Sequence, residues 1–502
     1  MTRHVVVAGY GMAGARLVEE LRARDHRMRI TVLGAEQRPA YNRVLLSSVL
    51  AGSLPPDAIR LHHPDWAATH GIDIRVGTQA LGIDREARLV TTGAGDSVGY
   101  DVLVLATGSR PWLPPTAGLS GTGGQPADGV VAFRTVADCE AILAATGRIA
   151  VLGGGLLGLE AARGLAGRGR DVTVVHPGGH LMERQLDAGA GRVLGRTLAG
   201  LGVTVRLGTF ATRYDPEARG LELDDGSFLP AGLVVVATGV RPEVGLARQA
   251  GLAVEHGVLV DDQLRSVTDP RIRAIGECAE HRGTVHGLVQ PAWEQATVVA
   301  DLLTGADPDV LYRGSRTVTR LKARDVDLAA MGDIPDQEDD PVLGIEAIQL
   351  TDASRGRYAK VVLRDDRVLG AIVLGFPEAA ARLTQLYDAD LPAPSDRLGL
   401  LLGATVPEVG NPGQLPDRAV VCRCNTVTKG GLTAAWAGGA RSVAALAEAT
   451  RATTGCGGCT DVVCGIAEWL EAADPLDGID PLDGTDPRHA ADPRREIEEG
   501  AA

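Results

Sequence analysis

The feature that most constrains this chain is a glycine-rich turn between an apolar strand pattern and a helical pattern. The apolar run HVVVA is followed by Gly9-x-Gly11-x-x-Gly14 and then by apolar residues at helical spacing. Gly9 permits a tight turn, Gly11 lets a pyrophosphate approach the backbone, and Gly14 allows the helix to pack closely on the strand. The helix N-terminus supplies N–H groups and a positive dipole to phosphates. The turn therefore predicts a dinucleotide-binding strand–helix–strand unit.

An acidic residue completes this unit. The next apolar run, 29–33, is followed by Glu36, which lies 22 residues past Gly14 and is placed to accept hydrogen bonds from a ribose. A glycine motif alone is weak evidence, because glycine-rich turns also serve packing alone. Strand, turn, helix, strand and acid in this order favour a nucleotide site.

A second unit of the same kind follows. A strand pattern leads into Gly153, Gly155 and Gly158, and then into a helix and another strand. We place His176 at the ribose position, where an acid would favour NADH and an arginine cluster would favour NADPH. His176, with Arg184 eight residues further on, favours neither coenzyme, and a solvated loop histidine is an equally good interpretation.

Two turns suggest how the chain passes between nucleotide domains and how it holds a cofactor. A buried-strand pattern ends in the small-residue turn Thr107-Gly108, which is typical of a chain leaving one nucleotide domain for another. Later, Gly276-Glu277 ends a strand and opens a helix, so the carboxylate can hold a ribityl chain. Cys278 beside them is interpreted as a small apolar filler and not as a redox residue.

Four of the seven cysteines form two close pairs, Cys422-x-Cys424 and Cys456-x-x-Cys459. Such a set suits a tetrahedral zinc or a [2Fe–2S] cluster. Zinc sites more often use CxxC at both ends, so we favour the cluster, held in a compact helical module. Cys464 lies on the following helix and is expected to be buried, while Cys139 receives no role.

Composition excludes several classes of function. The formal net charge of −14 argues against a nucleic-acid partner, although a partner protein with a basic docking patch is compatible with it. No apolar run reaches membrane-spanning length, and the N-terminal stretch reads as a β-strand and not as a signal peptide. We therefore expect a cytoplasmic protein without membrane association.

The chain of 502 residues is long enough for several domains. The expected fold class is α/β, with two Rossmann-like dinucleotide-binding domains, a small α+β domain and a small helical [2Fe–2S] domain; the family resemblance described below implies FAD in the first domain and NAD(P) in the second. The expected divisions are an FAD domain at 1–111 and 243–305, an NAD(P) domain at 112–242, the α+β domain at 311–389, a linker at 390–417, the cluster domain at 418–471 and a disordered tail at 472–502.

A family resemblance can be named on these motifs. The phrases AYNRVLLS at 40–47, LGGGLLGLE at 152–160, LMERQLD at 181–187 and IGECA at 275–279 are similar to FAD-dependent pyridine-nucleotide oxidoreductases, in particular the NADH-oxidising part of assimilatory nitrite reductases. The paired cysteines resemble the [2Fe–2S] domain of bacterioferritin-associated ferredoxin. Together these resemblances cover roughly residues 2–472.

The resemblance implies roles for three further residues. Glu160 would lie near the nicotinamide, although an ordinary carboxylate in the first turn of a helix is an alternative. Arg43 and Ser47 would lie near the flavin and its pyrophosphate, with a capped surface turn as their alternative. No acid–base or nucleophile constellation is expected.

One departure from the nitrite reductases bears on the partner. Those enzymes continue into a sirohaem and [4Fe–4S] half with four further cysteines, which this sequence does not include. The chain is therefore most similar to electron-transfer subunits of assimilatory nitrate reductases. The resemblance implies hydride transfer from NAD(P)H to FAD, single electrons to the cluster, and then transfer to a separate molybdenum-containing chain. A homodimer is a further expectation.

Three alternatives are open at this point. A diffusible reductase for a ferredoxin or rubredoxin would use the same cofactors. The flavin subunit of an amine or opine oxidase can carry a similar cysteine module, but the second glycine turn speaks against it because such enzymes do not need NAD(P)H. A non-enzymatic redox or iron sensor would reduce its flavin too slowly for turnover.

Overall fold

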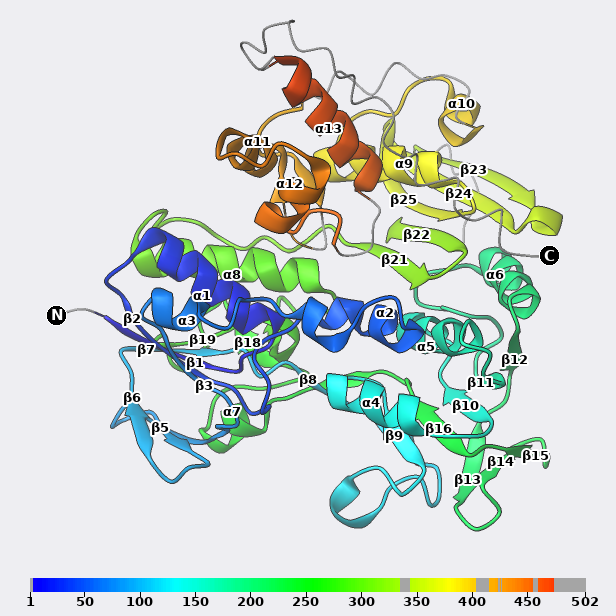
Figure 1. The fold of residues 1–502 in the computed structure, drawn as a ribbon, viewed down its shortest axis with the longest axis horizontal. Coiled ribbons are helices and arrows are strands. Elements are labelled where there is room, and N and C mark those ends of the chain that lie inside the picture. The colour runs from blue at the N-terminus through cyan, green and yellow to red at the C-terminus, as the bar shows by residue number, and fades with distance from the viewer. Residues whose placement is uncertain are drawn as a thin grey trace, which may run out of the picture.

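The computed structural model describes residues 3–334, 344–402, 415–422, 425, 427–454 and 459–473 (Figure 1). Its first region is built on an all-parallel sheet in the order β19-β7-β1-β2-β3. These strands are β1 (His4–Ala8), β2 (Arg29–Leu33), β3 (Asp73–Arg75), β7 (Val102–Leu105) and β19 (Ile272–Ala274). The edge strand β19 comes from much later in the chain, so the sequence leaves this region and returns to it.

Two helices that are far apart in sequence pack together on this sheet. They are α1 (Met12–Arg24) and α8 (Val289–Thr304). The indole Nε1–H of Trp293 in α8 donates to the carbonyl of Met12 at 3.3 Å. Aliphatic side chains of α1, α8 and both faces of the sheet form one core, as expected for parallel strands covered by helices.

A second all-parallel sheet has the order β12-β11-β10-β16-β9. It consists of β9 (Val130–Ala132), β10 (Ile149–Leu152), β11 (Val172–His176), β12 (Val203–Leu207) and β16 (Leu233–Val236). The helices of this region are α4 (Val136–Ala144), α5 (Leu156–Ala166) and α6 (Ala188–Gly200). The first two regions are joined by a two-stranded antiparallel ribbon of β8 (Ser109–Pro111) and β17 (Val240–Pro242).

A third, antiparallel sheet has the order β21-β22-β25-β24-β23. Its elements are β21 (Val318–Ala323), β22 (Val326–Gly332), β23 (Ile345–Asp352), β24 (Arg357–Arg364) and β25 (Arg367–Leu374), with α9 (Pro377–Ala389) and α10 (Arg397–Leu402). Residues of β21, β22, β24 and β25 share a hydrophobic core with α5, α6 and α2 (Leu46–Ala51). The helix α2 thus links all three regions.

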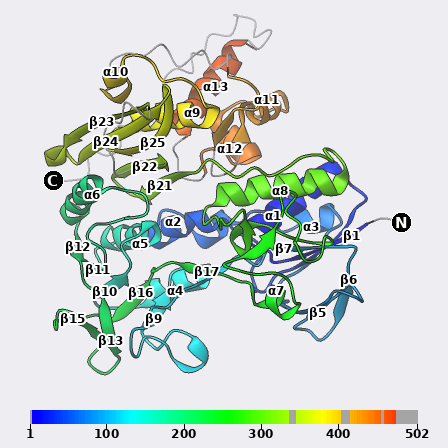
Figure 2. The same cartoon turned by 180° about the vertical axis from the view of Figure 1, so that it is seen from behind.

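The C-terminal module packs around its own small core. It contains β26 (Val420–Cys422), β27 (Val427–Thr428), α11 (Lys429–Ala437), α12 (Val443–Thr450) and α13 (Thr460–Ala473). The β26–β27 pair corrects the expectation of a purely helical module, since the first cysteine stands at the end of a short strand. Both views show the module over α8 and α1, next to α9 (Figure 1, Figure 2).

The remaining elements are short. They are β4 (Ala80–Asp84), β5 (Leu89–Thr92), β6 (Ser97–Gly99), β13 (Ala211–Asp215), β14 (Gly220–Leu223), β15 (Phe228–Pro230), β18 (Val258–Val260), β20 (Ala279–His281), α3 (Trp66–Thr69), α7 (Gly245–Gln249), and the 3-10 helices η1 (Arg43–Leu45), η2 (Pro56–Ile59), η3 (Thr122–Gly124), η4 (Gly276–Cys278) and η5 (Ala353–Arg355). No helix within the described residues is long and apolar enough to cross a bilayer.

Candidate functional site

The first glycine turn connects β1 to α1. Gly9 has φ +119°, and a Cβ there would collide with the carbonyl oxygen of Ala106. A Cβ on Gly14 would collide with the carbonyl oxygen of Gly9. Gly11 differs, because nothing lies within 4 Å of its Cβ position and it is the N-cap of α1 without a side-chain cap. The first N–H groups of α1 therefore face an open cradle that suits a pyrophosphate.

The second turn, from β10 to α5, repeats this geometry. Gly153 has φ +116°, and a Cβ on it would meet the carbonyl oxygen of Ala237. A Cβ on Gly158 would collide with the carbonyl oxygen of Gly153, whereas Gly155 is an uncapped N-cap with open space around it. Both cradles fit a dinucleotide by the same criterion.

The hydrogen-bond register of the two units corrects the sequence alignment of their ribose positions. The Gly9 N–H donates to Leu33 at 2.8 Å, and the Gly153 N–H donates to Val175 at 2.9 Å. Leu33 therefore corresponds to Val175, and three residues further Glu36 corresponds to Gly178, not to His176. The sequence prediction places His176, the last residue of β11, at the ribose position, whereas Glu36 lies three residues past the end of β2.

An acidic side chain nevertheless lies beside Gly178, the residue that corresponds to Glu36. The carboxylate of Glu183 lies against Gly178, where a Cβ would collide with it. Its Oε2 is 3.4 Å from Nε2 of His176, whose side chain is only 13 % exposed, so this histidine is not freely solvated. Burial lowers the pKa of His176, and Glu183 opposes that shift. The sequence carried no signal for Glu183 beyond its place in the LMERQLD phrase.

Glu36 and Arg43 are brought together at the edge of the first cradle. The Tyr41 hydroxyl donates to Glu36 at 2.8 Å, and the Arg43 guanidinium forms an ion pair with the same carboxylate. Burial raises the pKa of Tyr41 above its ordinary value. Arg43 also donates to the carbonyl of Arg134 at 3.3 Å, so it links the first region to the segment before α4.

Ser47 lies in α2 and is buried, with no hydrogen-bond partner for its hydroxyl among the described residues. An unpaired buried hydroxyl costs free energy unless a ligand or water satisfies it. This orphaned group therefore fits a residue that contacts a bound cofactor and does not fit a capped surface turn.

The turns near the β8–β17 ribbon connect the segments that leave and re-enter the first region. The Thr107 hydroxyl donates to the carbonyl of Glu243 at 2.6 Å, which ties the outgoing segment to the returning one. Gly108 has φ +71° and bends the chain into β8. Gly276 has φ +76°, and its N–H donates to the buried amide oxygen of Gln295 at 2.7 Å.

Glu277 forms a polar group with two residues that the sequence did not indicate. Its carboxylate accepts hydrogen bonds from the Ser109 hydroxyl and the Arg134 guanidinium, and Arg134 also donates to Ser109 at 2.8 Å. Arg134 Nε is buried without a partner in the part of the chain described. This group therefore offers both a carboxylate and a cation to polar atoms of a ligand at the domain junction.

Glu160 is buried in α5 at 5 % exposure. Its Oε1 accepts a hydrogen bond from the backbone N–H of Lys322 in β21 at 2.9 Å. One turn later, the Arg163 guanidinium forms an ion pair with Asp325 at 2.6 Å. The structure thus places Glu160 at the contact between α5 and the third sheet, and its position beside a nicotinamide stays a prediction.

Two of the four predicted cluster ligands can be placed, while Cys424 and Cys456 lie outside the described residues. Cys422 and Cys459 are both buried. The Asn425 side-chain amide donates to the sulfur of Cys422 at 3.7 Å, and the Thr453 N–H donates to the sulfur of Cys459 at 3.3 Å. Hydrogen bonding from Cys459 lowers the pKa of Cys422. These donors favour thiolates, the form that binds an iron–sulfur cluster.

The other cysteines are structural or peripheral. Cys139 and Cys278 are buried, and their thiols donate to backbone carbonyls. Burial raises the pKa of both thiols, which supports the packing interpretation of Cys278. Cys464 on α13 is partly exposed, contrary to the expectation of burial.

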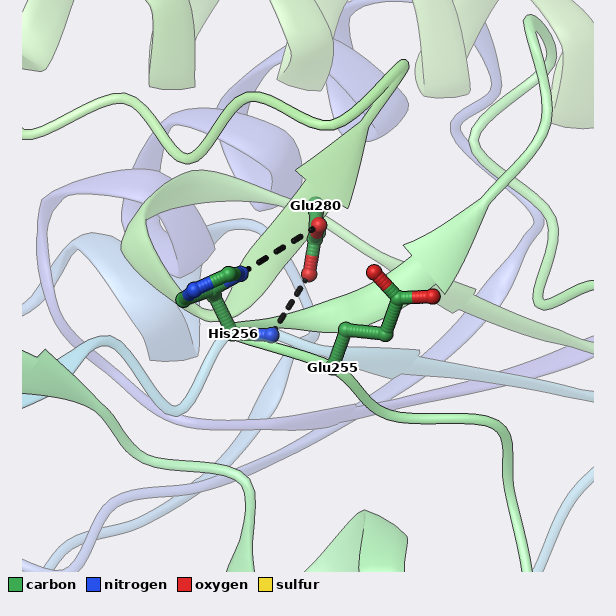
Figure 3. A group of neighbouring side chains, drawn as sticks. All are labelled: Glu255, His256 and Glu280. Atoms are coloured by element: carbon green, nitrogen blue, oxygen red, sulfur yellow. Dashed lines mark hydrogen bonds and ion pairs between the residues drawn. The ribbon is translucent and has the colours of Figure 1, made fainter.

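Glu255, His256 and Glu280 are the one group of three potential metal ligands found within the described ranges (Figure 3). One oxygen of the buried Glu280 accepts hydrogen bonds from the amides of His256 and Gly257, both at 2.8 Å. Its other oxygen is 3.8 Å from the exposed His256 ring. The carboxylate closes the turn before β18, so we assign no metal to this group.

Three protein-family models match separate parts of the chain. Residues 3–297 match the pyridine nucleotide-disulphide oxidoreductases. Residues 318–388 match the rubredoxin NAD+ reductase C-terminal domain, and residues 420–468 match the BFD-like [2Fe–2S] binding domain.

Curated relatives extend over most of the chain. The NAD(P)H nitrite reductase of Bacillus subtilis (strain 168) is 37 % identical over 471 residues, covering 92 % of this chain and 57 % of the relative. The assimilatory nitrate reductase electron transfer subunit of the same organism is 37 % identical over 472 residues, covering 92 % of this chain and 59 % of the relative. The chain thus spans somewhat over half the length of both. A rubredoxin-NAD(+) reductase of Alcanivorax borkumensis is 33 % identical over 318 residues, covering 61 % of this chain and 80 % of the relative.

Solved structures share the fold. Putidaredoxin reductase in its covalent complex with putidaredoxin is 28 % identical, with a TM-score of 0.70 over 81 % of this chain and 99 % of that chain. A ferredoxin reductase from Rhodopseudomonas palustris is 26 % identical, also with a TM-score of 0.70, over 81 % of this chain and 100 % of that chain.

These matches confirm the α/β fold class with Rossmann-like regions and a C-terminal [2Fe–2S] module. They also confirm the expected cofactor set of FAD, NAD(P)H and a [2Fe–2S] cluster, and an oxidoreductase as the class of enzyme. The chain belongs to the family of pyridine nucleotide-disulphide oxidoreductases.

Proposed function

We propose that this chain oxidises NADH or NADPH and passes the electrons through FAD and a [2Fe–2S] cluster to a redox partner protein. The first candidate partner is the molybdenum-containing catalytic chain of an assimilatory nitrate reductase. The observation that carries the proposal is the presence, in one chain, of two matching glycine cradles and a buried cysteine pair with N–H groups directed at its sulfurs. When bound, FAD accepts two electrons as a hydride and releases them singly to the cluster.

In this proposal the first cradle holds FAD. The α1 N-terminus at Gly9, Gly11 and Gly14 binds the pyrophosphate, and Glu36 orients the ribose. The Glu277 carboxylate would accept hydrogen bonds from the ribityl chain. Arg43 and Ser47, the turns at Thr107-Gly108, and Gly276 complete the cofactor site.

The second cradle, at Gly153, Gly155 and Gly158, holds the pyrophosphate of NAD(P)H, and Glu160 is assigned to the nicotinamide end. Cys422, Cys424, Cys456 and Cys459 would bind the cluster. Buried thiolates with N–H donors suit this role because the hydrogen bonds offset the sulfur charge. We also propose the domain division given in the sequence analysis, a homodimeric state and a cytoplasmic location.

A ferredoxin- or rubredoxin-type reductase is the second candidate. It is supported by the match of residues 318–388 and by the similarity to a rubredoxin-NAD(+) reductase. The well-formed second cradle counts against an amine or opine oxidase, since such an enzyme has no need for NAD(P)H. Membership of an oxidoreductase family likewise counts against a purely sensory role.

The test is an anaerobic titration of the purified holoprotein with NADH and with NADPH, followed by visible absorption. We expect the flavin bands and the cluster bands to bleach together. Reoxidation is then measured with the catalytic chain of an assimilatory nitrate reductase, with ferredoxin, with rubredoxin and with nitrite. Fastest reoxidation by ferredoxin or rubredoxin would select the second candidate, and bleaching of flavin alone would remove the cluster from the route.

A matched pair of variants identifies the cluster ligands. Cys422→Ser should abolish the cluster absorption while the flavin bands stay and still bleach with coenzyme. Cys464→Ser, on the partly exposed cysteine of the same module, should leave both absorptions unchanged. A cluster that survives Cys422→Ser would contradict the ligand assignment.

A further inference from the structure

One arginine of the cluster module contacts the flavin region directly. Arg451 Nη1 donates to the carbonyl of Leu61 at 2.7 Å, and Arg451 Nη2 donates to the carbonyl of Arg60 at 3.0 Å. These residues are separated by about 390 positions in the chain. A guanidinium presents a planar fork of N–H groups, so it can hold two neighbouring carbonyls at once, which a lysine cannot do with the same geometry.

The backbone of the same arginine holds the cysteine loop. Its carbonyl accepts a hydrogen bond from the Asn425 side-chain amide at 2.5 Å, and that amide also donates to the sulfur of Cys422. The Thr454 hydroxyl donates to the Arg451 carbonyl at 2.8 Å. Arg451 has φ +65° and ends α12, so it turns the chain into the segment that leads to Cys459. Movement of Arg451 would therefore displace groups bonded to the candidate cluster ligands.

On the other side of the contact, the docking carbonyls belong to the framework of the first cradle. His62 follows Leu61 directly, and its Nδ1 is hydrogen-bonded to the Tyr10 hydroxyl at 2.8 Å. Tyr10 stands between Gly9 and Gly11 in the glycine turn itself. The His62 ring also stacks on Trp66, with a centroid separation of 3.9 Å and an interplanar angle of 5°.

A second set of contacts also ties the docking segment to the first cradle. Its backbone pairs with the segment that leads to Arg43, through a bridge between Tyr41 and Arg60 and a hydrogen bond from the Leu61 N–H to Ala40 at 2.9 Å. Tyr41 in turn donates to Glu36 at the ribose position. A module attached at Arg60 and Leu61 is thereby fixed relative to the cofactor site.

We propose that Arg451 latches the cluster module onto the flavin region and positions the cluster for electron transfer within the chain. The inference rests on the proposed function, since a latch of this kind matters only if electrons pass from flavin to cluster. Arg451 is a positioning residue: it forms no bond to a cofactor. With both cofactors bound, FAD would supply the electrons taken as a hydride from NAD(P)H, the cluster would take them one at a time, and the partner protein would be the final acceptor. Arg451 would hold the module that carries the cluster at a fixed place on the flavin region.

The test compares the holoprotein with Arg451→Met, Arg451→Lys and Arg418→Met. Arg418 is an exposed arginine of the same module and serves as the matched control. The first measurement is hydrogen exchange of peptides spanning residues 56–66. Loss of two charge-assisted hydrogen bonds should speed exchange there roughly tenfold in Arg451→Met, with a smaller increase in Arg451→Lys. Arg418→Met should behave as the unaltered protein does.

The second measurement is a stopped-flow mixing with NADH that follows the flavin and cluster bands separately. Flavin bleaching should keep its rate in all variants, whereas cluster bleaching should slow roughly tenfold in Arg451→Met. Should Arg451→Met lose its cluster absorption, Arg451→Lys decides, because it keeps the positive charge but cannot bond both carbonyls with the geometry of the guanidinium.

The outcomes separate this inference from the function on which it rests. If the cluster of the unaltered protein accepts no electrons from NADH, the proposed function fails. If it accepts them, and Arg451→Met and Arg451→Lys match Arg418→Met in both hydrogen exchange and cluster bleaching, the latch is overturned while the function stands.

Discussion

The two glycine cradles have the same backbone path, but they differ at one contact beside the glycines. The large residue of that contact comes from the glycine turn in the first unit and from the end of the next strand in the second. In the first unit, Tyr10 packs over Gly34, where a Cβ would lie 3.0 Å from the Tyr10 Cβ. In the second unit, Gly154 stands at the place of Tyr10, and His176 stands at the place of Gly34. A Cβ on Gly154 would lie 2.7 Å from the His176 ring. The glycines thus determine the path of the backbone, while the contact beside them is filled by Tyr10 of the turn in the first unit and by His176 of the following strand in the second.

The ribose acids differ in origin and in their neighbours. Glu36 lies three residues past the end of β2 and is ion-paired with Arg43. Glu183 comes from the segment before α6 and lies beside His176, whose lowered pKa favours a neutral imidazole. A carboxylate beside the ribose opposes the 2′-phosphate of NADPH. We therefore expect the two cradles to hold different nucleotides and the second to prefer NADH to NADPH.

The largest effects are expected from the first glycine of each cradle. Gly9→Ala and Gly153→Ala each force a side chain with positive φ into a carbonyl oxygen, at a cost of about 1–2 kcal/mol for the conformation alone. Gly9→Ala should yield protein that has lost most of its flavin absorption. Gly153→Ala should retain flavin but lose at least about tenfold in kcat/KM for NADH. The readouts are the flavin-to-protein absorbance ratio and steady-state kinetics with ferricyanide as acceptor.

Gly155→Ala is the control for these variants. Its Cβ position is open, so the protein should fold normally, and only the approach of the coenzyme pyrophosphate should suffer. If Gly153→Ala lowered the flavin content as much as Gly9→Ala does, the assignment of different nucleotides to the two cradles would be wrong.

An intermediate effect is expected at the second ribose acid. Glu183→Ala should raise KM for NADH roughly tenfold with little change in kcat, because hydrogen bonds to a charged group contribute about 1.5–3 kcal/mol. KM for NADPH should fall or stay constant, so the ratio of kcat/KM for NADH to kcat/KM for NADPH should decrease. Glu36→Ala is the matched variant in the first unit, and it should lower flavin content without changing coenzyme preference. A preference that is unchanged in Glu183→Ala would remove Glu183 from the ribose site.

The sequence predicted those features that depend on local backbone requirements. Gly9 and Gly153 must adopt positive φ, and only glycine does so without strain, so both turns could be recognised from a short motif. The paired cysteines predicted a cluster module because their spacing is itself the ligand pattern. The β26–β27 pair was missed because two short strands give no periodic signal.

The features that the sequence did not predict depend on contacts between distant segments. Arg134 reaches Glu277 across 143 positions, and the Lys322 amide reaches Glu160 across 162. Glu183 reaches Gly178 through a loop whose path cannot be read from residue spacing. In each case an unremarkable charged residue acquires its role from tertiary structure alone.

The smallest expected effect is on the pH dependence of stability, and it concerns His176, which corresponds to Gly34 of the first unit. Burial lowers the pKa of His176 below its ordinary value of 6.5, against the opposing effect of Glu183, while His180 also lies nearby. The unfolded chain therefore binds a proton at this residue at a higher pH than the folded chain does. The stability from the neutral ring is fully present above about pH 6.5 and is lost as the pH falls through the lowered pKa.

His176→Asn keeps a neutral polar side chain and should flatten this dependence. Between pH 7.5 and pH 5, the Tm of the unaltered protein should fall further than that of His176→Asn, by a few degrees at most. His63→Asn, at an exposed histidine, should follow the unaltered protein. If His176→Asn lost as much Tm on acidification, then the ring would titrate as a solvated histidine does. The contact between His176 and Gly154 would then be a matter of packing alone, without a pH-dependent contribution to stability.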